Sequence, residues 1–197
     1  MSEEKDTYIS RSKWVALASV MTALALVGNY ALVAVPSVEF GTTILFVTAY
    51  VFGLNMGIWV ALLMSLVFGM INPWGGFIPQ IWIFQVIGWS YVCATAAVLG
   101  KGEIVSSHGR PGRLKLAGVG SFTTLIFDLL TNAGYSLAFG IPYWIAVLSG
   151  APFTIVHILS NALLLPLAVP RLEAAIKQDL GVSIWSMQDD RLEWTEE

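Results

Sequence analysis

The sequence contains little charge. Only 12% of its 197 residues are charged, about half the share in an ordinary soluble domain, and 21 of the 23 charges lie in residues 1–13, 101–115 and 171–197. Two apolar blocks of 87 and 55 residues separate these segments, and each block holds one charge, Glu39 or Asp128. A soluble fold could not keep such blocks away from water. The composition therefore predicts an integral membrane protein, and the lack of a basic patch excludes a nucleic-acid binder.

The sequence also lacks the residue sets of several enzymes. Its single cysteine, Cys93, allows neither a disulfide nor a paired-thiol metal site. A phosphate-binding loop needs Gly, four residues and then Gly-Lys-Ser/Thr, whereas the one Gly-Lys pair, Gly100-Lys101, has neither flank. Asp128 and His157 alone are too few for an intramembrane aspartyl protease or a catalytic zinc site. We therefore expect no catalytic residue, no metal and no cofactor, and predict that the chain is not an enzyme.

The positions of the charges predict the topology. A helix needs about 20 residues to cross the apolar core of a bilayer, so the first block has room for about four spans and the second for two. Every Lys and Arg lies in the three polar segments, and cationic flanks stay in the cytoplasm. Each block must therefore leave and re-enter at the same side. The sequence predicts an all-α, polytopic membrane protein with six transmembrane helices and both termini in the cytoplasm.

Turn residues divide the blocks into helices. The second helix, of about eleven residues, is too short to span unaided, which predicts backbone that is buried in protein or lines a cavity. Glycines and prolines between Pro73 and Pro79 exclude regular helix there, and Gly150-Ala151-Pro152 predicts a break in the last helix. We expect helices over about residues 14–35 and 42–52, a third that ends near 71, and others over 80–99, 116–138 and part of 144–169.

These boundaries give three regions. They are a cytoplasmic N-terminal segment (1–13), a six-helix membrane domain (14–170, with a cytoplasmic loop at about 100–115) and a cytoplasmic tail (171–197). Apolar residues recur in the tail at helical spacing, which predicts an amphipathic helix on the inner membrane surface. The last nine residues carry six charges and are expected to be disordered.

Polar side chains recur one helical turn apart in the last two predicted helices. Asp128, Asn132 and Tyr135 share one face of the fifth helix, and His157 and Asn161 are four residues apart in the sixth. A short connection makes these helices antiparallel neighbours, so the two polar faces can meet. The pattern fits a ligand or ion site, and it also fits a structural network that holds the helices together.

Further candidate ligand contacts lie near the outer side. Gln85 is flanked by Trp82 and Trp89 at helical spacing, and Trp74 lies in the Gly-rich 72–76 loop, which is typical of a flexible lid. For Trp89 and Trp144, ligand contact and an interfacial aromatic belt are both open. Glu39 is expected to be a solvated carboxylate in an external loop. This leaves Asp128 as the first candidate for the site.

Three stretches resemble a known family. They are Ala16 to Ala25 in the first helix, Phe127-Asp128-Leu129-Leu130-Thr131-Asn132, and Pro152-Phe153-Thr154-Ile155-Val156-His157 with Ser160-Asn161. Together with six short or broken helices and the external Gly/Pro/Trp loop, they resemble the S components of energy-coupling factor (ECF) transporters over about residues 11–170. S components are the substrate-binding membrane subunits of prokaryotic vitamin importers.

The resemblance implies a division of labour. The chain would capture a vitamin or related micronutrient in an outward-facing cavity closed by external loops, in the prokaryotic plasma membrane. A transmembrane T component, energised by two cytoplasmic ATPases, would then turn the cavity inward. Small residues of the first helix would dock the T component, because they allow close approach. This sequence lacks the usual Ala-x-x-x-Ala pair at Ala16, and the candidate docking residues are Ala16, Ala18, Ser19, Thr22 and Ala23.

The substrate is constrained by the absence of Lys and Arg from both apolar blocks. A phosphate or carboxylate group would lack a cationic partner, so we expect a neutral or cationic vitamin-like compound, such as a flat heteroaromatic molecule. A rival hypothesis is a proton-coupled secondary transporter or channel in which Asp128 and His157 form a relay. A third is a scaffold whose polar pairs only hold helices together.

Overall fold

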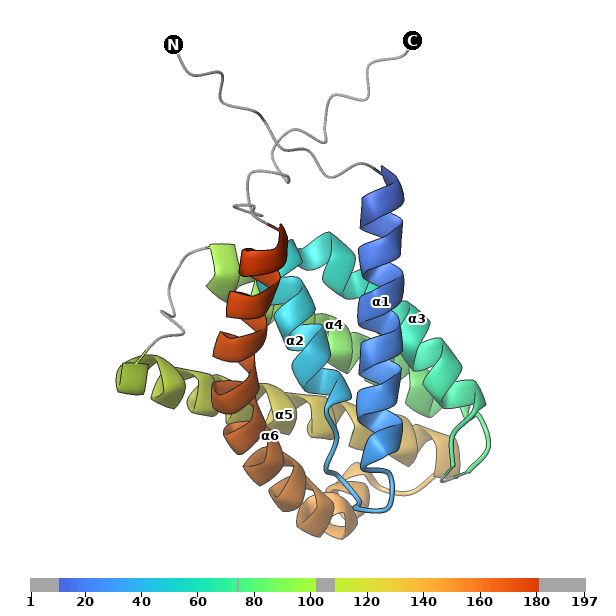
Figure 1. Ribbon diagram of the computed structural model, residues 1–197. Coiled ribbons are helices and arrows are strands. Elements are labelled where there is room, and N and C mark those ends of the chain that lie inside the picture. Colours follow the sequence, from blue (N-terminus) through green and yellow to red (C-terminus); the bar gives the residue numbers. More distant parts are fainter. Residues whose placement is uncertain (1–10, 74, 102–108, 181–197) are drawn as a thin grey trace, which may run out of the picture.

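The computed structural model describes residues 11–73, 75–101 and 109–180 (Figure 1). Over these residues the chain is all-helical and contains no strand, as the sequence predicted. Four of the helices, α1, α4, α5 and α6, are long and apolar enough to cross a membrane, and α2 and α3 are shorter apolar helices. These lengths mark the chain as a membrane protein. The helices of the described residues are α1 (Arg11–Ala31), α2 (Gly41–Phe52), α3 (Leu54–Met70), α4 (Pro79–Lys101), α5 (Gly109–Phe139) and α6 (Tyr143–Leu180).

The short helix α2 lies at the centre of the bundle. All 12 of its residues are buried, and it packs against α1, α3, α4 and α6. At 1.5 Å per residue it is about 18 Å long, well short of the apolar core of a bilayer. In Figure 1 its first turn lies above the lower ends of α1 and α6. The prediction that the second helix is too short to span, with its backbone buried in protein, is confirmed.

Helices α5 and α6 pack closely through glycines. A Cβ atom at Gly150 would lie 2.8 Å from Oδ1 of Asn132 in α5, so the missing side chain lets the two helices approach. The predicted break at Gly150-Ala151-Pro152 is wrong, because α6 continues through Pro152, Pro166 and Pro170. Figure 1 shows α6 curved along its length. A proline removes one backbone hydrogen bond, and a helix can bend there without ending.

Three helix boundaries differ from the prediction. Helix α1 ends at Ala31, four residues before the expected end at 35. Helix α5 begins at Gly109, seven residues before the expected start at 116, and its first turns include Arg113 and Lys115. The helical part of the tail is present, but it continues α6 instead of forming a separate helix, and Leu172 and Ile176 pack against the core. The predictions for most of the N-terminal segment, the middle of the 100–115 loop and the acidic tail fall on residues 1–10, 102–108 and 181–197, outside the described residues.

The two ends of the helical bundle hold different segments of the chain. Figure 1 shows the start of α1 and the end of α6 at one end, together with the turn between α2 and α3. The connections of residues 32–40, 71–78 and 140–142 lie at the opposite end. We call this opposite end the loop end. The two non-helical stretches expected around 72–76 and 139–142 are confirmed there, and Trp74 itself lies outside the described residues.

Candidate functional site

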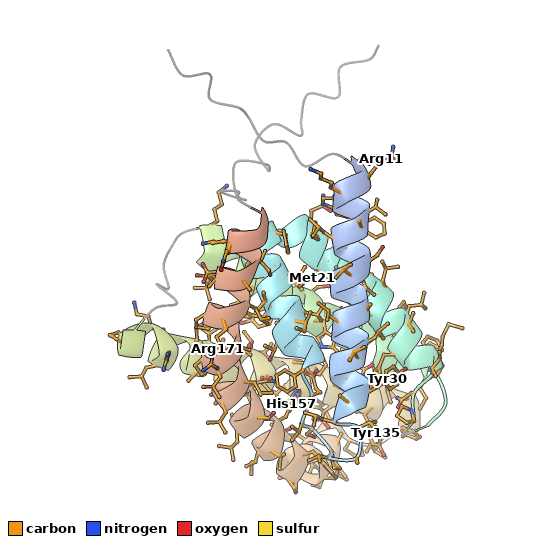
Figure 2. The ribbon with its side chains drawn as sticks, viewed as in Figure 1. Arg11, Met21, Tyr30, Tyr135, His157 and Arg171 are labelled. Atoms are coloured by element: carbon orange, nitrogen blue, oxygen red, sulfur yellow. The ribbon has the colours of Figure 1, made fainter. Side chains whose placement is uncertain are left out.

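Three ionisable side chains from separate parts of the chain meet near the loop end. Nδ1–H of His157 in α6 donates a hydrogen bond of 2.9 Å to Oδ1 of Asp128 in α5. Nε2 of His157 lies 3.6 Å from Oε1 of Glu39, just before α2. The side chains of His157, Asp128 and Glu39 are 9%, 14% and 19% exposed, so all three are largely buried. We call Glu39, Asp128 and His157 the charged triad. Figure 2 shows His157 nearer to the loop end than Arg171 of the same helix.

The contact between Asp128 and His157 follows from the spacing in the sequence. Both residues project from antiparallel neighbours joined by a three-residue connection, 140–142, and their polar faces meet as predicted. Asn132, one turn from Asp128, donates a hydrogen bond of 2.8 Å from Nδ2 to the backbone oxygen of Asp128. Oδ2 of Asp128 is buried and has no hydrogen-bond partner. The second carboxylate oxygen therefore remains available to another donor.

Glu39 is the largest departure from the sequence prediction. We expected a solvated carboxylate outside the helices, but the side chain turns into the protein and reaches the charged triad. Its Oε2 accepts a hydrogen bond of 2.8 Å from the backbone N–H of Thr42, in the first turn of α2. Burial opposes ionisation, but the charge of His157 and the hydrogen bond from the Thr42 N–H outweigh it, so the pKa of the Glu39 carboxyl lies below its ordinary value of 4.5. The sequence feature that could have indicated this role of Glu39 is its position at a helix N-terminus, which favours negative charge.

Three cavities adjoin one another at the loop end. The large cavity, of about 410 Å³, contains Asp128 in its wall. The small cavity, of about 140 Å³, contains Glu39 and His157, and a third, the middle cavity, has about 250 Å³. Shared wall residues connect them: Ser37 lies between the large and small cavities, Gln85 between the small and middle ones, and Tyr135 between the large and middle ones. The large cavity is lined by Ser37, Asp128, Thr131, Asn132, Tyr135, Ala146, Ser149, Gly150, Phe153 and Thr154.

Most of the predicted site residues line these cavities. Asn132 and Tyr135 line the large cavity beside Asp128. Trp82 and Gln85 line the middle cavity, where the Trp82 ring packs against Phe77 with ring centres 5.7 Å apart. The predicted site therefore comes together around one end of the bundle.

Asn161 is placed differently. It is fully buried, and its Nδ2 donates a hydrogen bond of 3.0 Å to Oγ1 of Thr124 in α5. None of the three cavities has Asn161 in its wall. A neutral hydrogen bond between two helices is the geometry of the structural network that the sequence also allowed. Asn161 therefore holds α5 and α6 together, one helical turn from His157 on the side away from the loop end.

For two residues of the small cavity, the sequence either left the role open or gave no indication of one. Trp89 is buried, and its Nε1–H donates a hydrogen bond of 3.1 Å to Oγ1 of Thr42, whereas Trp144 is 63% exposed. Trp89 thus belongs to the protein interior and Trp144 fits an interfacial belt. Asn29 of α1 was not singled out, yet it is buried and lines the small cavity. No polar residue lies one helical turn from it in the sequence, at positions 25, 26, 32 or 33, so no pattern distinguishes it.

The predicted docking residues divide between two faces of α1. Ala18 and Thr22 are buried against the core of the chain itself, so they are not available for close approach by a partner. Ala16, Ser19 and Ala23 are exposed, on a face that also presents Val20 and Val27. The structure therefore leaves Ala16, Ser19 and Ala23 as the docking candidates on the exposed face of α1.

The charges of the site are unbalanced. Two carboxylates with an imidazolium carry a net charge of −1, and with a neutral imidazole −2, and no Lys or Arg among the described residues lines the three cavities. Across the described residues, no three His, Cys, Asp or Glu side chains are arranged to hold a metal ion. A largely buried site with excess negative charge favours a cation or a hydrogen-bond donor over an anion.

Comparison of the chain with models of protein families, with curated proteins and with solved structures finds no match.

Proposed function

We propose that the chain is the substrate-binding membrane subunit, or S component, of an ECF-type importer that captures a vitamin or related micronutrient. The observation that carries the proposal is the group of three adjoining cavities at the loop end, with the charged triad in their walls. Cavities of a few hundred Å³ with a few convergent polar groups are typical of small-molecule sites. The resemblance of the sequence indicates the family. The cavities support a substrate site at the loop end, which would face outward in an S component.

The proposal includes an orientation in the prokaryotic plasma membrane. All six helices would be embedded in the membrane, the loop end would face outward, and both termini would lie in the cytoplasm. The support is that α1 starts and α6 ends at the same end of the bundle, opposite the cavities (Figure 1). The basic residues Lys101 and Arg113 flank the connection between α4 and α5, as expected of a cytoplasmic loop.

The partners would be a transmembrane T component and two cytoplasmic ATPases, with the lipid bilayer around them. The sequence contains no phosphate-binding loop, so ATP hydrolysis by that route would belong to other chains. The exposed face with Ala16, Ser19 and Ala23 on α1 is the surface that would dock the T component. Small residues permit the close helix contacts that replace a hydrophobic driving force within the membrane.

Retention of a small molecule by the purified chain tests this function. The full chain, extracted in mild detergent, should carry one small molecule in native mass spectrometry, and Asp128→Asn should weaken its retention because the carboxylate lies in the wall of the large cavity. A matched control is Glu173→Gln, which removes a buried carboxylate from the far part of α6. Absence of any retained molecule, combined with uptake by this chain alone in liposomes, would overturn the proposal.

A proton-coupled secondary transporter or channel is a second candidate. The observation that favours it is the position of His157 between two carboxylates, at 2.9 Å from Asp128 and 3.6 Å from Glu39. Chains of acidic and imidazole groups within membranes carry protons in pumps and transporters. Liposomes that contain only this chain should then acidify when substrate moves inward, without any ATPase. An S component should bind substrate and move none of it under these conditions.

A further inference from the structure

The small cavity has the dimensions of one aromatic ring. Its volume is about 140 Å³, close to the roughly 150 Å³ of an apolar protein cavity that holds one benzene molecule. It is too small for a fused ring system with substituents. The walls come from the 33–39 segment and from α1, α3, α4, α5 and α6, so the pocket lies inside the bundle and not on its lipid-facing surface.

Aromatic side chains form one side of the small cavity. Trp89 and Phe127 pack with ring centres 5.1 Å apart, both are buried, and Phe68 of α3 completes this side. The Phe127 ring also meets the His157 imidazole edge-on, with centres 5.9 Å apart. Aromatic faces attract flat rings, and they attract cations through the negative face of their π-systems.

The other side of the small cavity presents hydrogen-bond acceptors. Oε1 of Glu39 lies 3.6 Å from Nε2 of His157, beyond a hydrogen bond. Asn29 is 4% exposed and its Oδ1 also has no partner, while its Nδ2 reaches only the weak acceptor Sδ of Met64, at 3.1 Å. Buried polar atoms without partners carry a cost that a ligand with N–H donors would relieve.

The small cavity lies next to the large cavity. Ser37 belongs to both the small and the large cavity, and its backbone φ of 60° is uncommon for a residue other than glycine. On the far side of Ser37, the large cavity presents the side chains of Asp128, Asn132 and Thr154. A ring in the small cavity could therefore carry a polar substituent that extends into the large one.

We infer that the small cavity binds a single six-membered heteroaromatic ring with a protonated nitrogen, whose N–H groups face Glu39 and Asn29, and that the polar remainder of the substrate occupies the large cavity. This inference rests on the proposed function and narrows its substrate class to heteroaromatic cations. One positive charge would bring the charged triad, with an imidazolium, from −1 to neutral. An anionic ring would meet two carboxylates and no Lys or Arg.

Three ring-sized probes test the inference on the full chain in detergent micelles or nanodiscs. They are 4-aminopyridine, which is a cation at neutral pH, aniline, which has the same shape without the charge, and benzoate, which is an anion. Dissociation constants can be read from quenching of tryptophan fluorescence, since Trp89 lines the cavity. We expect 4-aminopyridine to bind about tenfold or more tightly than aniline, the value of one charged hydrogen bond, and benzoate to show no binding.

Substitutions test whether the probes bind in the small cavity. Glu39→Gln should weaken 4-aminopyridine to the affinity of aniline, and the control Glu173→Gln should leave both affinities unchanged. If Glu39→Gln unfolds the chain, Val33→Phe serves instead, because it adds a ring to the wall of the small cavity and should abolish binding of 4-aminopyridine. Equal binding of 4-aminopyridine and aniline, preferred binding of benzoate, or no binding of any probe would each overturn the inference.

Failure of this inference and failure of the proposed function give different results. A small molecule retained in native mass spectrometry, with no preference for the cationic probe, would leave the S-component proposal in place and reject the heteroaromatic cation. Binding of 4-aminopyridine that depends on Glu39, together with substrate uptake by the chain alone, would support the ring site and reject the S component.

Discussion

Replacement of His157 by leucine should leave two buried carboxylates without their shared partner. At an effective dielectric constant of about 20, the contacts of 2.9 Å and 3.6 Å correspond to gross attractions of about 6 and about 5 kcal/mol. Desolvation of the three groups cancels much of this, and removal of one partner from a buried ion pair typically costs about 3–5 kcal/mol. We expect His157→Leu to lower the free energy of unfolding by about 3 kcal/mol at pH 7.

The physical origin of this loss can be isolated by a second substitution. Asp128→Asn removes one of the two unpaired charges, so the double variant His157→Leu/Asp128→Asn should be more stable than His157→Leu alone by about 1–2 kcal/mol. Asn161→Leu is the matched control in α6, because it removes only a neutral hydrogen bond to Thr124, at about 1 kcal/mol. In that background Asp128→Asn should give no rescue.

Unfolding in mixed micelles with increasing SDS, followed by tryptophan fluorescence, measures these free energies. The coupling is the difference between the effect of Asp128→Asn in the wild type and its effect in the His157→Leu variant. If Asp128→Asn lowers the stability of both backgrounds equally, the charges do not interact in the folded protein. The reasoning from the charged triad would then be refuted.

Three further predictions concern single elements of the fold. Gly150→Ala should lower the free energy of unfolding by about 1–3 kcal/mol because its Cβ would meet an amide of α5 at 2.8 Å, while Gly118→Ala, with no atom within 4 Å, should be neutral or stabilising in the same SDS titration. Because the folded pKa of Glu39 is lowered from 4.5, its stabilising contribution is fully present above pH 4.5 and is lost as the pH falls through the folded pKa. Thermal midpoints recorded from pH 7 to pH 3 should show this loss. The Glu39→Gln variant should lack the part of the pH dependence that comes from Glu39. Trp89→Phe should cost about 1 kcal/mol through its lost hydrogen bond, and Trp144→Phe, at a 63% exposed position, should change the melting temperature little.

The sequence contained enough to locate most of the helices and two of the three residues of the charged triad. Glycines and prolines mark the ends of α2, α3 and α4, because those residues act on the backbone locally and need no knowledge of the fold. The meeting of Asp128 and His157 was also predictable, since the helical spacing places each on a polar face and the short connection makes the helices neighbours. Local rules and one short connection suffice for both results.

Other features depend on neighbours that the sequence does not reveal. Glu39 belongs to the site through its contact with His157, 118 positions further along the chain, and no local pattern encodes a contact over that separation. Gly150 looks like a break because the same residue that ends helices also permits close packing. Trp89 and Trp144 have similar apolar surroundings in sequence, and only the arrangement of the helices decides which one faces the interior.

The shortness of α2 also determines where a negative charge can be held inside this protein. The N-terminus of a helix carries a partial positive charge from its aligned peptide dipoles, and the N–H of Thr42 in that first turn donates to Glu39. A helix long enough to span would bring this dipole end to the membrane surface, where water would screen it. Because α2 starts inside the bundle (Figure 1), its dipole acts in a medium of low polarity and stabilises the ionised form of Glu39 beside the small cavity.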